Sequence, residues 1–172
     1  FLVDRHADHG LARTDAGQRG LDGGRHPGRV IHRACAPAAG VIGAAHAGRV
    51  GLAAGVLQAT VAALRARGAR QLTAWIGPHV CGACYEVPKE LADQVAQQVP
   101  GTRSTTSWGT PALDLGAGGA RVLAHLGVET VDVAACTLES ADLHSYRRDA
   151  AASGRQAGII WLAGACRTKN AG

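Results

Sequence analysis

From Val41 onward, short apolar runs alternate with segments of helical character, and this alternation limits the folds open to the chain more than any other feature. The apolar runs have strand length and occupy residues 41–45, 71–76, 111–115, 128–133 and 158–162. Helical segments are predicted at 52–67, 88–99 and 116–126. Strands that alternate with helices predict a layered domain of α/β type.

Residues 52–67 show the helical spacing most clearly. Val56, Ala59 and Ala63 form the centre of an apolar stripe that neighbouring leucines and valines widen. Gly68 follows as a candidate helix C-cap. We expect this stripe to pack on a sheet in which residues 41–45 and 72–76 are neighbouring or next-neighbouring strands.

Composition narrows the class of protein. The 172 residues are 47% hydrophobic but only 3% aromatic, so the core must consist mainly of Ala, Val, Leu and Ile. No apolar run approaches the roughly 20 residues that span a membrane, and we expect no membrane contact. Five cysteines at irregular spacing do not form a disulfide framework. We therefore expect reduced thiols and a cytoplasmic protein, either a monomer or a weak homo-oligomer.

The formal net charge of +5 has three explanations. Lys and Arg are spread along the chain without a basic run. Ordinary surface charge is the simplest explanation, a small anionic substrate comes second, and nucleic acid comes last. We expect a small molecule as partner and no nucleic acid.

Residues 1–38 differ from the rest of the chain. They are rich in Gly, Arg, His and Asp, and no helical or strand period persists in them. They predict an atypical segment that is either flexible or poorly folded, before a domain at 39–164 and a disordered tail at 165–172. The chain has no Met, which predicts that Phe1 is not a natural start.

Three motifs contain residues suited to catalysis. The first places His46 between a predicted strand and a helix, followed by Gly48 and Arg49. An imidazole at this position can face a ligand, and Arg49 can pair with a phosphate or carboxylate. Position alone favours the simpler alternative, a hydrogen-bonded histidine at a strand end.

The second motif is a CxxC formed by Cys81 and Cys84, close to His79. A structural zinc site would require a second pair of ligands, and we find no matching pair in the sequence. A redox role is the second possibility, although a thioredoxin-like context is missing. The third is a glycine-rich turn with two incidental thiols. We expect these cysteines to hold no metal.

The third motif contains adjacent arginines, Arg147 and Arg148, with Arg155 further along. Such arginines can hold a phosphate or a carboxylate. A charged loop in which Arg148 pairs with Asp149 explains the pattern equally well.

Taken together, the three motifs resemble the laccase-domain family over about residues 39–162. The matching segments are, in chain order, HAGRVGLAAGV, GPHVCGACYEVP, CT with HSYRRD, and GR. Members of that family are known as purine nucleoside phosphorylase, polyphenol oxidase and peptidoglycan editing factor. The resemblance implies an α+β fold with a layered α/β/β/α sandwich and mixed sheets, here incomplete at the N-terminus. It also implies zinc, or copper as the alternative, at a site of one Cys and two His.

The implied activity is phosphorolysis of adenosine, inosine or methylthioadenosine to a base and ribose 1-phosphate, with accompanying adenosine deamination. The motifs assign further matches to Tyr85, Glu86, Ser145 and Arg155. The resemblance implies catalysis by His46 and Cys35, substrate or phosphate binding by Arg49, Tyr146, Arg147 and Arg148, and metal binding by His46, Cys35 and His9.

The N-terminal part departs from the family pattern. The family's cysteine lies in Asp-Cys-x-Pro, whereas Cys35 follows Ala34 and lies only eleven residues before His46. His9 is the remaining candidate for the first histidine. An out-of-frame segment or an internal deletion explains both departures. Three hypotheses follow: a zinc-dependent nucleoside phosphorylase, a Cys-His hydrolase of cell-wall peptide precursors, or an inactive fragment. Close approach of Cys35 to His46 would favour the two enzymes.

Overall fold

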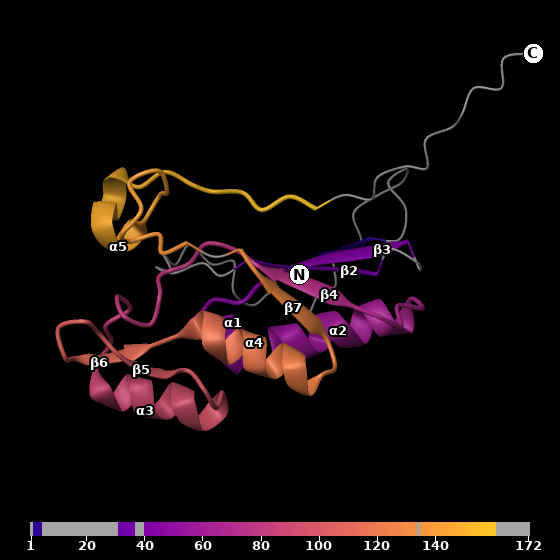
Figure 1. The fold of residues 1–172 in the computed structure, drawn as a ribbon, viewed down its shortest axis with the longest axis horizontal. Coiled ribbons are helices and arrows are strands. Elements are labelled where there is room, and N and C mark those ends of the chain that lie inside the picture. Colours follow the sequence, from indigo (N-terminus) through magenta and orange to yellow (C-terminus); the bar gives the residue numbers. More distant parts are fainter. Residues whose placement is uncertain (1, 5–30, 37–39, 134, 161–172) are drawn as a thin grey trace, which may run out of the picture.

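The computed structural model describes residues 2–4, 31–36, 40–133 and 135–160, with side chains in the last two ranges. The strands are β1 Leu2–Asp4, β2 Ile31–Ala36, β3 Val41–His46, β4 Thr73–Ile76, β5 Arg103–Thr105, β6 Pro111–Leu113 and β7 Glu129–Asp132. The helices are α1 Arg49–Ala53, α2 Val56–Ala66, α3 Lys89–Gln98, α4 Leu115–His125 and α5 Tyr146–Asp149. Figure 1 shows their arrangement.

The larger sheet has the strand order β1-β3-β2-β4-β7. Its pairs are antiparallel except for β4 and β7, which run parallel. Helices α2 and α4 contact each other and lie on one side of this sheet, and α3 packs on the β5–β6 hairpin (Figure 1). The α+β class with a mixed sheet is confirmed. Strands β3 and β4 are next neighbours on either side of β2, as predicted.

The predicted helix at 52–67 is two helices. Gly55 lies between α1 and α2 with a φ of 78°, in the left-handed region that favours glycine. Helix α1 also begins earlier than predicted, at Arg49. A single continuous helix over 52–67 is therefore wrong. The apolar spacing continues through the break, which explains why periodicity alone did not reveal it.

The buried face of α2 is rotated from the predicted stripe. The helix buries the face that contains Leu57, Thr60, Val61 and Leu64. Ala59 is exposed, and Val56 and Ala63 are half-buried. The prediction that Val56, Ala59 and Ala63 form the centre of the buried face was therefore wrong. Large aliphatic side chains remove more apolar area from water than alanines do, so they determine which face turns inward.

The other elements mostly follow the sequence. Predictions at 88–99, 111–115, 116–126 and 128–133 correspond to α3, β6, α4 and β7. Leu and Val side chains fill the core, as the composition predicts. The predicted strand at 158–162 does not form in residues 158–160, and its remainder lies outside the described residues. Among the helices that the structure describes, none has the length and apolarity needed to cross a membrane.

Helix α4 packs closely on its neighbours because it contains glycines. Asp114 caps its first turn by accepting a 2.7 Å hydrogen bond from the Ala117 backbone N–H. A Cβ at Gly118 would overlap the Thr102 side chain, which is fully buried. These glycines reduce helix propensity, and in exchange they let the helix axis approach the loop before β5.

We expect Gly118→Ala to destabilise the fold by about 1–3 kcal/mol, because the new methyl group overlaps a rigid, β-branched side chain. Chemical denaturation measures the change. Thr102→Ser removes the overlapping methyl group while keeping the hydroxyl that donates to the Val99 carbonyl. The double variant should therefore regain part of the loss. Equal stability of Gly118→Ala and the wild type would contradict this explanation.

Candidate functional site

The loop after β4 and the loop after β7 leave the larger sheet at the same edge, because these strands are parallel neighbours with Ile76 opposite Asp132. The backbones of the loops then continue side by side. The His79 N–H donates to the Ala135 carbonyl at 3.2 Å, and the Thr137 N–H donates to the His79 carbonyl at 2.9 Å. Two segments that are distant in sequence thus face each other at the carboxyl ends of the strands.

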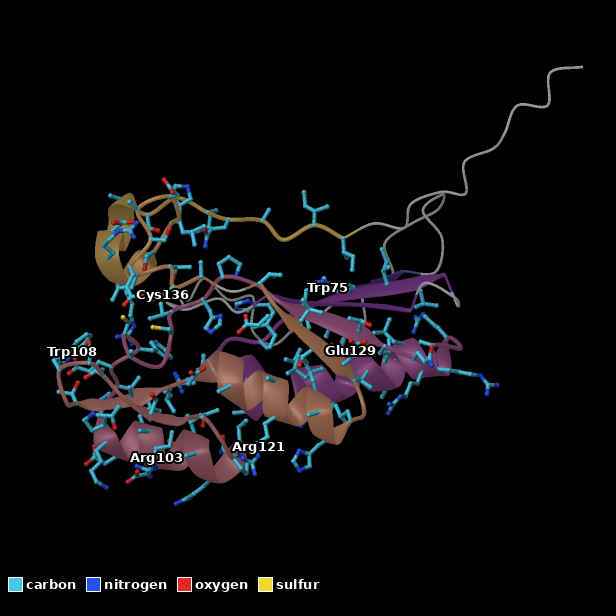
Figure 2. All side chains as sticks on the ribbon, viewed as in Figure 1. Trp75, Arg103, Trp108, Arg121, Glu129 and Cys136 are labelled. Carbon is cyan, nitrogen blue, oxygen red and sulfur yellow. The ribbon has the colours of Figure 1, made fainter. Side chains whose placement is uncertain are left out.

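The two loops bring together Cys81, Cys84, Cys136 and Glu139, which we call the thiol–carboxylate cluster. One ligand atom from each residue lies within 4.8 Å of the other three. The Cys84 thiol donates to Glu139 Oε1 at 3.3 Å. Sulfur atoms gather beside Cys136 in Figure 2. The conclusion that the sequence offers no second pair of possible ligands for the CxxC was wrong, because Cys136 and Glu139 lie beside it.

The three thiols of the cluster differ in acidity. Burial raises the pKa of Cys84 far above its usual value, and the neighbouring Cys81 and Glu139 side chains raise it further. Burial also acts to raise the pKa of Cys136, but backbone N–H donors from Cys81 and Glu139 bring it below its ordinary value. The Cys81 N–H lies 3.5 Å from Cys136 Sγ. Cys136 is therefore the thiol that ionises first.

An open hollow of about 380 Å³ lies beside the cluster. The side chains that line it come from the ends of β4 and β7, from both loops and from the first turns of α4: Ile76, His79, Cys81, Asp114, Gly116, Ala117, Ala120, Thr130, Asp132, Ala135 and Cys136. Its volume is sufficient for a small ligand. His46, Tyr146, Arg147 and Arg148 do not line this hollow. The roles that the resemblance implies for them stay predictions.

His79 forms one wall of the hollow and is held from two sides. Its Nδ1 is 3.0 Å from the Gly77 carbonyl, and the side chain is only 8% exposed. A Cβ at Gly116 would overlap the Nε2 side of the ring. The glycine therefore leaves space for the imidazole at the start of α4.

The two arginines of the third motif have different environments. The Arg148 guanidinium donates to the Thr137, Leu138, Ser140 and Leu143 carbonyls and to both Asp149 oxygens. Arg147 instead lies over the ring of buried Tyr85, with Cζ 4.3 Å from the ring centroid. Within the described residues it has no ion pair or hydrogen bond. The charged-loop alternative, an Arg148–Asp149 pair, is present at 2.8 Å.

The first motif forms the end of β3 and the start of α1. His46 is the last residue of β3 and its side chain is exposed, while Arg49 begins α1 and is half-buried. Helix α1 has only five residues, so the dipole at its N-terminus adds little to the binding of an anion by Arg49. Tyr146 is half-buried at the start of α5.

The strand register separates Cys35 from His46. Cys35 pairs with Ile42, whereas His46 pairs with Ile31 at the other end of the same two strands. Four residues of strand correspond to about 13 Å, which exceeds what two ligands of one zinc ion can span. His9 lies outside the described residues. The described residues therefore do not fit the Cys-His-His metal site that the resemblance implies.

Comparisons with known proteins agree with one another. The chain is 57% identical over 129 residues to purine nucleoside phosphorylase ORF3 of Streptomyces griseus, covering 73% of this chain and 52% of that protein. It is 50% identical over 129 residues to purine nucleoside phosphorylase SCO2081 of Streptomyces coelicolor, covering 73% and 53%. The chain thus spans about half the length of the curated relatives it matches.

Solved structures give the same result. Protein NMB0706 of Neisseria meningitidis, described as DUF152, superposes with a TM-score of 0.59 at 31% identity, covering 70% of this chain and 52% of that one. YlmD of Geobacillus stearothermophilus superposes with a TM-score of 0.58 at 27% identity, covering 72% of this chain and 49% of that one. The family described as multi-copper polyphenol oxidoreductase laccase matches residues 33–163. The chain belongs to this laccase-domain family.

Proposed function

We propose that this chain contributes to a purine nucleoside phosphorylase, which cleaves adenosine, inosine or methylthioadenosine with phosphate. The observation that carries the proposal is the placement of Arg147, whose guanidinium rests on the Tyr85 ring without a charged partner among the described residues. The names of the Streptomyces relatives support the same reaction class. Adenosine deamination is included in the proposal through the family resemblance alone.

The two arginines would have different roles, Arg148 in structure and Arg147 in phosphate binding. Arg148 uses its donors on four carbonyls and Asp149, so it orders the loop. Arg147 retains its N–H donors while the ring contact limits its motion. A guanidinium with free donors binds two phosphate oxygens at once. We therefore assign phosphate binding to Arg147 first, with Arg49 and Tyr146 as further candidates.

The reaction balances without an additional reactant. A phosphate oxygen bonds to C1′ of the ribose while the bond from C1′ to the base nitrogen breaks. The departing base keeps the bonding electrons and takes up the proton that hydrogen phosphate gives up. The products are free purine and ribose 1-phosphate, or its 5-methylthio derivative when methylthioadenosine is the substrate. Positive charge develops on the sugar in the transition state, and a bound phosphate dianion stabilises it.

We propose His46 as the group that moves the proton, because its imidazole is exposed at a strand end and imidazole is the side chain most often used for general acid–base catalysis. No step is assigned to the family's zinc or copper, because Cys35 and His46 are separated by the register of their strands. We place the protein in the cytoplasm, where nucleosides occur and the thiols of Cys81, Cys84 and Cys136 stay reduced.

A second candidate is a family fragment that is inactive alone. The separation of Cys35 from His46 by the register of β2 and β3 favours it. The same separation weighs against a Cys-His hydrolase of peptidoglycan precursors, which needs the thiol beside its base. A copper polyphenol oxidase has no specific support among the described residues.

Arg147→Ala should raise the KM for phosphate about 10–100-fold, which corresponds to loss of one charged hydrogen-bonding partner. Arg147→Lys should recover part of the loss, since it keeps the charge but not the planar fork. Steady-state kinetics with phosphate and adenosine varied separately measure both effects. An equal rise in both KM values would argue against a phosphate site at Arg147.

Arg148→Ala is the matched variant and should act on stability. Loss of its hydrogen bonds should cost about 2 kcal/mol and lower the Tm by about 4–8 °C. Differential scanning calorimetry of Arg147→Ala and Arg148→Ala compares the two side chains directly. Equal Tm losses in the two variants would contradict the division of roles.

His46→Ala should reduce phosphorolysis at least about 100-fold while leaving the Tm nearly unchanged, because the side chain is exposed. We expect the present chain to have weak activity or none. The assay therefore also needs a chain whose N-terminal segment restores an Asp-Cys-x-Pro strand. Full activity of the present chain, unaffected by His46→Ala, would refute the proposed role of His46.

A further inference from the structure

We propose that the thiol–carboxylate cluster of Cys81, Cys84, Cys136 and Glu139 binds one zinc ion, which fastens the loop after β4 to the loop after β7. The site is distinct from the Cys-His-His site that the resemblance implies, and shares no residue with it. The proposal does not depend on phosphorolysis. An inactive fragment with this structure would bind the same ion.

The geometry of the cluster is close to that of a bound tetrahedral ion. The four ligand atoms lie within 4.8 Å of one another. Tetrahedral zinc, with Zn–S bonds of about 2.3 Å and Zn–O bonds of about 2.1 Å, separates its ligands by about 3.5–3.8 Å. Movements of roughly 1 Å or less would close the site. Such movements are within the range of side-chain rotation.

The backbone already holds both ligand pairs in place. The CxxC turn is closed by bonds from the Cys84 and Tyr85 N–H groups to the Cys81 carbonyl, at 3.0 and 2.9 Å. Paired backbone bonds between His79 and the segment around Cys136 fix the second loop against the first. The Cys81 N–H points at Cys136 Sγ, as expected for a donor that supports a thiolate. Little chain entropy is then lost on binding.

The chemistry of the donors selects zinc. Three thiolates disfavour magnesium and calcium, which bind oxygen ligands. The carboxylate of Glu139 favours zinc over copper(I), because zinc accepts carboxylate ligands whereas copper(I) prefers soft sulfur donors. Three thiolates with a carboxylate carry four negative charges, so the site with zinc bound keeps a net charge of −2. Arg148 does not offset this charge, because its guanidinium is paired with Asp149. It holds the carbonyls on either side of Glu139 and so fixes the backbone of this ligand. Cys84 also precedes Tyr85, so the ion would help fix the ring beneath Arg147.

Metal analysis of the full chain tests the proposal. Purified under reducing conditions and dialysed against micromolar zinc, the wild type should hold one zinc per chain. Cys136→Ser should lose it, and Glu139→Gln should bind at least about tenfold more weakly. Cys35→Ser is the matched control outside the cluster and should keep the ion. Zinc that persists in Cys136→Ser but disappears in Cys35→Ser would place the metal at the family's site and overturn the proposal.

Cobalt substitution identifies the number of sulfur ligands in the wild type, so this test does not require that any variant folds. The sulfur-to-cobalt charge-transfer band should have the intensity of three thiolates, and zinc should displace it. An intensity of one thiolate, or a disulfide between Cys81 and Cys84 found by mass spectrometry in the reduced preparation, would overturn the proposal. Saturating zinc should also raise the Tm of the metal-free chain by about 5–10 °C, and no shift would count against it.

Discussion

The parallel pairing of β4 with β7 is the interaction on which the candidate functional edge depends. It is the only parallel pair among the described strands, and it directs both following loops to the same side of the sheet. The hollow, the thiol–carboxylate cluster and the contact of Arg147 with Tyr85 all lie in or between these loops or at the strand ends. Residues that are distant in sequence thus share one chemical environment.

Much of the secondary structure could be predicted from the spacing of apolar residues. Helix α3 begins one residue after Pro88 and ends two before Pro100, as the prolines indicate. The helix break at Gly55 and the buried face of α2 were harder to predict. Periodicity of apolar residues does not reveal a residue in the left-handed region, and it does not decide which of two overlapping apolar faces is buried. Tertiary packing made that choice in favour of the larger side chains.

The candidate site was less accessible to sequence reasoning, for a topological reason. Cys136 and Glu139 repeat the spacing of Cys81 and Cys84, but more than fifty residues later, and only the strand pairing makes them neighbours. The motif around Arg147 and Arg148 was visible, yet its division into a carbonyl-bound and an unpaired guanidinium required side-chain contacts. The separation of Cys35 from His46 required the register of the hairpin.

The long connection between Ile76 and Glu129 also affects the order of folding. Strands β2 and β3 are separated by only four residues of sequence, whereas β4 and β7 cannot pair until the 52 intervening residues have been drawn together. Closing such a loop loses entropy before its contacts repay it, and non-local pairings slow folding. We therefore expect the candidate functional edge to form later than the pairing of β2 with β3. Until then its three thiols are open to solvent and to oxidation.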